Sequence, residues 1–191
     1  VPEFGSLRAS GLWGMALMVS AICRSECPIG VPAEPLRMSQ GVRSFRSTDL
    51  KRCREILDGL PDWFGIPESN EGYLARLSPE VSAVFESESS VYGFVSMLHH
   101  NPASVEIEVI AVDPERRGAG IGRQLMSWVE EVARREDVRW LHVKTRGPGT
   151  PDPQYEQTRA FYSHLEFGPL FESMGLWGPD DAALVFVKRI E

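Results

Sequence analysis

Hydrophobic and polar residues alternate in several short runs along the chain, and each such run predicts a β-strand. The first lies at 42–46. Residues 81–87 and 91–98 follow as two β-rich runs joined by a short polar link, which predicts a hairpin. Further strands are expected at 105–112 and 138–145, and the segments FGPLFES and ALVFVKRI predict two more near the end of the chain.

Between these strands the apolar residues follow a helical period instead. Ser47 or Thr48 can cap a helix that runs to about Gly59, and a short helix is expected near 68–77. Residues 155–165 are also typical of a helix. The clearest stripe follows the strand at 105–112, where five apolar side chains recur at helical spacing: Ile121, Leu125, Trp128, Val129 and Val132.

The order of these elements predicts an α+β fold. It reads β-α-α-β-β-β-α-β-α-β-β, and the strand–helix–strand in its middle implies one parallel pair inside an otherwise antiparallel sheet. We therefore expect a mixed, mostly antiparallel sheet of six to seven strands, flanked by helices. Residues 42–191 are predicted to form one domain.

Residues 1–41 are predicted to be an extension and linker outside that domain. The opening VPEFGS resembles a cloning scar, 11–23 is apolar over the length of a signal-peptide core, and 24–41 is rich in Pro, Gly and Ser. Met38 is a plausible natural start. Three interpretations stay open: cloning-derived or upstream sequence, a native extension, or a targeting segment. The apolar stretch is too short to span a bilayer, so no membrane association is predicted.

Composition narrows the class of partner. The formal net charge is −7, which argues against a nucleic-acid binder and slightly favours a cationic partner. Cys23, Cys27 and Cys53 form a sparse, odd set, which indicates reduced thiols of a cytoplasmic protein. No second Cys/His pair at zinc spacing follows the first two cysteines, and we predict no metal site.

The histidines do not change that expectation. His99 and His100 precede Asn-Pro and are predicted to lie in a turn. His142 and His164 are predicted to be strand and helix-surface residues.

The segment DPERRGAGIGRQL, residues 113–125, holds three glycines at alternate positions where a strand should give way to a helix. Backbone N–H groups at a helix start attract anions because they lack intrahelical partners, and glycines let a phosphate approach closely. Spacing alone leaves open a phosphate-binding loop or a turn with solvated arginines. A P-loop is excluded, because Arg-Gln follows the last glycine where Lys-Ser/Thr is needed. A dinucleotide fingerprint is excluded too, because it belongs on the first strand of a βαβ unit.

RGAGIG at 117–122 fits the signature (Gln/Arg)-x-x-Gly-x-(Gly/Ala), and with it the chain resembles the GNAT superfamily, the Gcn5-related N-acetyltransferases. The preceding IAVDPERR and the later RAFYSHLEFG are similar to the fourth strand and the penultimate helix of that family. The order of strands and helices over 42–191 also fits, so the resemblance covers most of the chain and implies a GNAT-like fold.

The resemblance implies that acetyl-CoA is the co-substrate. The main chain of Ile110 and Val112 would pair with its pantetheine arm, and the Ile110 amide would polarise the thioester carbonyl. The family makes room for this arm by parting two strands, here 105–112 and 138–145. The pyrophosphate would bind the backbone amides of the glycine segment: Arg117, Gly118, Ala119, Gly120, Ile121, Gly122 and Arg123.

Acetyl transfer to an amine needs a group that takes the amine proton and a proton for the departing thiolate. Glu106 and Glu108 should project from one face of their strand. The resemblance places Glu106 at the strand position of the general-base glutamate of the family's histone acetyltransferases; Glu108, or neither glutamate, is the alternative. Tyr162 falls where family members place the phenol that faces the CoA sulfur, and it is the candidate acid; a core tyrosine is the alternative. Two positions depart from the family: Glu166 stands where many members have Gly, and Tyr155 where they often have Asn.

The resemblance implies an acetyl-CoA-dependent N-acetyltransferase that transfers the acetyl group directly to a primary amine, because no cysteine lies near the glycine segment. The acidic charge slightly favours a small cationic acceptor. A protein lysine or N-terminal acetyltransferase and a non-catalytic acyl-CoA-binding module are the alternatives, and a homodimer stays open. Four aromatic residues are candidates to line the acceptor pocket or simply to pack in the core: Trp63, Phe64, Tyr73 and Trp177.

Overall fold

The computed structural model describes residues 40–149, 152–174, 176–177 and 182–191. The expectations for 1–39, including those for Cys23, Cys27 and Met38, lie outside this part of the chain. Among the described residues, no helix has the length and apolar character needed to cross a membrane.

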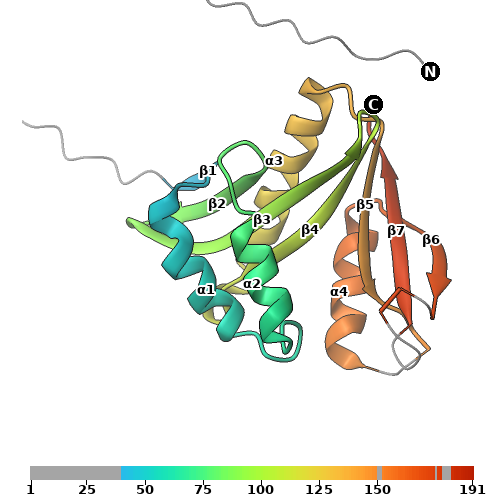
Figure 1. Cartoon of the computed structure of the whole chain (residues 1–191), viewed down its shortest axis with the longest axis horizontal. Coiled ribbons are helices and arrows are strands. Elements are labelled where there is room, and N and C mark those ends of the chain that lie inside the picture. Colours follow the sequence, from blue (N-terminus) through green and yellow to red (C-terminus); the bar gives the residue numbers. More distant parts are fainter. Residues whose placement is uncertain (1–39, 150–151, 175, 178–181) are drawn as a thin grey trace, which may run out of the picture. The chain divides into compact units, whose positions relative to one another are not determined.

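The described residues form a single mixed sheet with helices on both faces (Figure 1). Across the sheet the strands run in the order β1-β2-β3-β4-β5-β7-β6. The strands are β1 (Gly41–Ser44), β2 (Ser82–Ser87), β3 (Ser90–Asn101), β4 (Ser104–Val112), β5 (Trp140–Arg146), β6 (Gly168–Ser173) and β7 (Ala183–Arg189). The helices are α1 (Leu50–Asp58), α2 (Pro67–Ala75), α3 (Ile121–Arg135) and α4 (Pro153–His164).

The predicted fold class and element order are confirmed. All neighbouring strands pair antiparallel except β4 and β5, which are joined through α3 and pair in parallel. This is the parallel pair that the strand–helix–strand order requires. The predicted hairpin of β2 and β3 is also present, and its turn places Glu88 and Ser89 at φ of 51° and 61°.

Two apolar clusters fill the two sides of the sheet. One joins the sheet to α3 and α4 and includes Leu125, Val129 and Tyr162. The other joins it to α1 and α2 and includes Ile56, Leu57 and Leu74. The stripe expected on α3 is largely buried, because the positions at helical spacing face the sheet together.

Strand β4 changes face in its middle. Its pairing with β3 passes from Ile107 opposite Met97 to Val109 opposite Ser96, so Glu108 is an extra residue in a β-bulge. As a result Ile107 packs in the cluster beneath α3, whereas Val109 packs in the cluster beneath α1 and α2. The bulge therefore determines which face of the sheet the side chains after Glu108 point to.

Two local expectations are wrong. His99 and His100 lie within β3 and not in a turn, because the strand continues to Asn101. Ser47 and Thr48 lie inside a short 3-10 helix (Ser47–Asp49) and do not cap α1. The Asp49 carboxylate instead accepts the backbone N–H of Arg46 at 2.8 Å.

Candidate functional site

The parallel strands β4 and β5 stay together only at one end. Their pairing covers residues 104–106 of β4 and 140–142 of β5, and beyond it the strands diverge, as Figure 1 shows. A cleft of about 840 Å³ opens between them. Its walls come from 107–112 of β4, 143–145 of β5, α2, α4 and the loop before α3. The parting that the family resemblance requires is therefore present.

The open edge of β4 presents free backbone groups to this cleft. The backbone N–H of Asp113 donates to the carbonyl of Tyr92 on β3 at 2.8 Å. In an antiparallel ladder only alternate residues bond to a given neighbour, so Ala111 also bonds toward β3 while Ile110 and Val112 point away from it. With β5 splayed apart, the N–H and C=O groups of Ile110 and Val112 face the gap.

The glycine segment shapes the start of α3 beside this edge. Gly118 and Gly120 adopt φ of 76° and 78°, a left-handed conformation that favours glycine, and Gly120 is the N-cap of α3. A Cβ at Gly122 would meet the Phe161 ring at 3.3 Å, so glycine also permits close packing against α4. The loop and the first turn of α3 line the cleft, which brings the positive end of the helix dipole to it.

Trp63, in the connection between α1 and α2, joins three segments at the cleft. The Arg117 guanidinium stacks 4.1 Å from its ring centre, and its indole N–H donates to Thr158 Oγ1 on α4 at 3.1 Å. Tyr155 Oη donates to the Trp63 carbonyl at 3.4 Å. The Arg117 side chain thus stacks on an aromatic ring, while its backbone belongs to the glycine loop that lines the cleft.

Tyr162 lies on α4, lines the cleft and is buried. Its ring packs edge-to-face against Phe161 and Phe167, with centroids at 5.2 and 5.7 Å. Burial raises the pKa of the phenol well above its ordinary value, so the hydroxyl keeps its proton.

Glu106 is a buried carboxylate at the closed end of the cleft. Lys144 Nζ lies 2.8 Å from Oε1, and the Nε2 atoms of His100 and His142 lie 2.7 and 3.7 Å from Oε2. Burial by itself raises the carboxyl pKa, but hydrogen bonds from His142, Lys144 and His100 outweigh it and lower the pKa to about 2. A carboxylate stabilised in this way is a weak base.

Glu108 has different surroundings. Its Oε1 pairs with Arg76 at the end of α2, whereas Oε2 is buried and has no hydrogen-bond partner among the described residues. Two other buried atoms of the described chain share this state, Asn70 Oδ1 and Thr145 Oγ1. All three residues line the cleft. Buried polar atoms normally have partners, so these atoms mark where a ligand can supply them.

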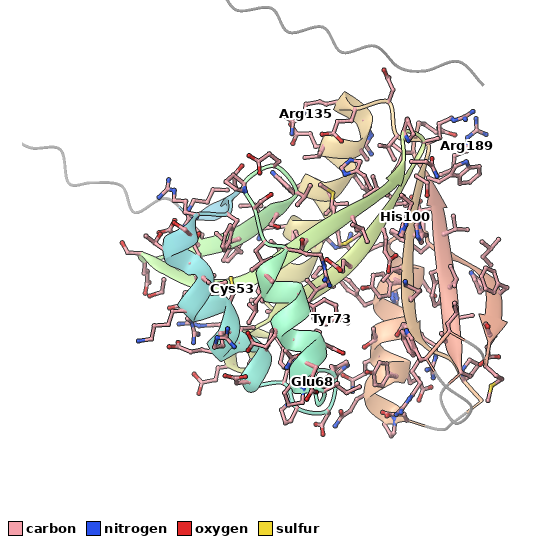
Figure 2. The ribbon with its side chains drawn as sticks, viewed as in Figure 1. Cys53, Glu68, Tyr73, His100, Arg135 and Arg189 are labelled. Carbon is pink, nitrogen blue, oxygen red and sulfur yellow. The ribbon has the colours of Figure 1, made fainter. Side chains whose placement is uncertain are left out.

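Sequence reasoning missed Asn70, Thr145 and Lys144. The signal for Thr145 was available, because alternation along β5 turns it to the same face as the buried Leu141 and Val143. No local pattern distinguishes Asn70, which depends on how α2 packs. The four aromatic candidates Trp63, Phe64, Tyr73 and Trp177 all line the cleft, and Figure 2 shows Tyr73 on α2 beside the opening.

The comparisons agree with this geometry. Residues 78–169 match the family model described as an acetyltransferase (GNAT) domain. No curated protein sequence matches the chain.

Solved structures share the fold at low sequence identity. An aminoglycoside 6'-N-acetyltransferase complexed with coenzyme A has a TM-score of 0.62 and 16% identity over 78% of this chain and 97% of that one. For yncA from Salmonella typhimurium, solved with acetyl-CoA, the TM-score is 0.64 and the sequence identity is 18%, over 80% of this chain and 95% of that one. For a ribosomal-protein-alanine N-acetyltransferase from Brucella melitensis, the TM-score is 0.60 and the identity is 21%, over 78% of this chain and 98% of that one. The chain therefore carries an acetyltransferase domain of the GNAT family.

Proposed function

We propose that this chain, through a domain spanning 42–191, transfers the acetyl group of acetyl-CoA directly to a primary amine. The observation that carries the proposal is the cleft between the diverging β4 and β5, which combines free strand-edge amides, a helix N-terminus and unpartnered acceptor atoms. The coenzyme A and acetyl-CoA bound in two structures of the same fold support the choice of donor.

The donor half of the reaction would use main-chain groups. Ile110 and Val112 pair with the pantetheine amides as an added strand does, and the Ile110 N–H polarises the thioester carbonyl. The amides of 117–123 bind the pyrophosphate at the start of α3. Backbone donors suit this task because their positions are fixed by the fold and need no rearrangement during reaction.

The acceptor half would use the unpartnered atoms. Asn70 Oδ1 and Glu108 Oε2 can only accept hydrogen bonds, so their natural ligand is a donor, and an amine nitrogen is one. An ammonium ion would bind here with its charge balanced by Glu108. Binding would therefore supply hydrogen bonds to two buried acceptor atoms that lack partners in the free enzyme.

The contacts favour Glu108 over Glu106 as the base. Glu106 is stabilised as an anion by Lys144 and two histidines, whereas Glu108 keeps one oxygen free within the cleft. Glu108 would take one proton from the bound ammonium, and the neutral amine nitrogen then forms its bond to the thioester carbon and releases its second proton to solvent. The carbon–sulfur bond then breaks and the thiolate leaves.

Tyr162 would stabilise that thiolate. Because burial raises the phenol pKa, full proton transfer to sulfur is uphill, and the hydroxyl acts chiefly by donating a hydrogen bond as the negative charge develops.

The acceptor is proposed to be a small cationic amine. The net charge of −7 and the free carboxylate oxygen of Glu108 favour it, and one structural neighbour is named for aminoglycosides. A protein amine is the alternative, since another neighbour is named for a ribosomal-protein alanine.

A thiol-release assay over a panel of polyamines, aminoglycosides and peptides tests the proposal. Glu108→Gln should lower kcat by about 10²–10⁴-fold because the base is lost, whereas Glu106→Gln leaves the base in place and should lower kcat far less. Tyr162→Phe should lower kcat while the acetyl-CoA Kd stays near the wild-type value. Acetyl-CoA binding without turnover on any acceptor would instead indicate a binding module.

A further inference from the structure

We propose that His100, Glu106 and His142 form a binding site for a divalent transition-metal ion, with zinc as the best match. The site lies at the closed end of the cleft and is separate from the groups assigned to acetyl transfer. It uses the two histidines and the carboxylate that the proposed reaction leaves without a role.

Three neighbouring strands each supply one ligand. His100 comes from β3, Glu106 from β4 and His142 from β5, and Glu106 and His142 are the last residues paired before β4 and β5 diverge. Figure 2 shows His100 at this end of the sheet. Strands fix backbone positions more firmly than loops do, which suits a metal site.

The distances fit a small ion after minor shifts. One ligand atom from each residue lies within 4.8 Å of the others, and the pairs to Glu106 Oε2 measure 2.7 Å from His100 and 3.7 Å from His142. Tetrahedral zinc bonds of about 2.0–2.1 Å place ligand atoms roughly 3.3 Å apart. The first pair therefore opens by about half an ångström and the second closes by slightly less.

Groups around the ligands already orient two of them. Ser104 Oγ lies 3.4 Å from His142 Nδ1, so that nitrogen can carry the proton and leave Nε2 free to bind metal. Lys144 holds Oε1 of Glu106 at 2.8 Å and leaves Oε2 for the ion.

The arrangement leaves room for a fourth ligand. His100 is exposed, and all three residues line a shallow hollow of about 570 Å³ together with Trp140 and Phe171. Two histidines and one carboxylate with an open position are the donor set of many zinc and iron sites. Water or a ligand from solution would complete the coordination.

Lys144 sets the limit on affinity. Its ammonium bonds to the same carboxylate, so a bound dication would feel a like charge nearby. Removing this charge should therefore tighten metal binding. If the cluster were only a set of structural ion pairs, the same change would remove one pair and would not improve metal binding.

The test is titration of the full chain with Zn²⁺ by calorimetry, and with Co²⁺ by absorption. Both use a chain carrying Cys23→Ser and Cys27→Ser, so that these thiols do not bind the ion. We expect one ion per chain, d–d bands of a histidine-ligated Co²⁺ site, and loss of both with His142→Gln. Ser104→Ala should weaken binding by about 10–100-fold, and Lys144→Leu should tighten it by about tenfold.

His99→Gln and His164→Gln are the matched controls. His99 pairs with Glu136 at 2.8 Å and His164 bonds the Ala160 carbonyl at 2.7 Å, so neither faces the site and both variants should bind metal as the parent does. Circular dichroism shows whether each variant is folded. Absence of binding by the parent, unchanged binding by His142→Gln, or weaker binding by Lys144→Leu would overturn the proposal.

Discussion

Replacing Glu166 by glycine should stabilise the protein, and the end of α4 explains why. The Phe167 N–H donates to the Tyr162 carbonyl at 3.1 Å and the Glu166 N–H to the Ser163 carbonyl at 3.0 Å. These two bonds define a Schellman motif, and Glu166 occupies its left-handed position at φ 67°. Glycine is the usual residue there because it has no Cβ to clash in this conformation.

The expected gain in the free energy of unfolding is the difference between the backbone strain that glycine removes and the conformational entropy that it adds to the unfolded chain. A non-glycine residue in the left-handed region costs about 1–2 kcal/mol, and the extra freedom of glycine in the unfolded chain costs about 0.5–1 kcal/mol. Lys188 lies 3.6 Å from the Glu166 carboxylate, but that side chain is 85% exposed, so the pair contributes little. We expect the free energy of unfolding to rise by about 0.5–1 kcal/mol and Tm by about 1–4 °C.

Urea unfolding of three variants measures this effect. Glu166→Ala removes the ion pair and keeps the strained backbone, so its stability should stay close to that of the wild type. Glu131→Gly, at an exposed position inside α3, should lose about 0.5–1 kcal/mol because glycine is unfavourable within a helix. If Glu166→Gly is no more stable than Glu166→Ala, backbone strain at this position is not the cause.

Two further predictions concern the glycine loop and the buried thiol. Gly120→Val should raise the acetyl-CoA KM by about tenfold or more, because a β-branched residue cannot adopt φ 78° and the start of α3 must shift. Arg123→Ala should change KM less, and equal KM values for Gly120→Val and wild type would contradict a phosphate site in this loop. Burial raises the pKa of Cys53 to about 12, so this thiol should react with a disulfide reagent at pH 8 only when the protein unfolds. The Cys23→Ser, Cys27→Ser chain isolates that reaction, and fast labelling in the native state would refute it.

The helices and strands and their order were predictable because each leaves a periodic pattern of hydrophobic residues in the sequence. The stripe on α3 and the alternation along the strands depend on local spacing, and they gave the elements and their order. The position of the glycine segment between β4 and α3 was readable for the same reason. The family resemblance adds Tyr162, far along the chain, as a candidate residue of the same site, and both line one cleft.

Side-chain environments were not predictable in the same way. Glu106 and Glu108 are two residues apart on one strand, so alternation does not distinguish them, and the family resemblance favoured Glu106 as the base. What separates them is tertiary: β3 and β5 bring His100, His142 and Lys144 to the first, and the end of α2 brings Arg76 to the second.

The divergence of β4 and β5 accounts for that difference. Where the strands still pair, a side chain on β4 has a neighbour on β5 at close range, and Glu106 gains His142 as its partner. Beyond the last pair no described β5 residue pairs with β4, and the bulge at Glu108 interrupts the regular pairing with β3 as well. One oxygen of Glu108 is therefore buried without a partner among the residues that the structure describes. The end of the β4–β5 pairing thus separates two carboxylates. Glu106, before it, has partners on both oxygens and is suited to hold an ion, whereas Glu108, beyond it, has one free oxygen and is suited to accept a proton.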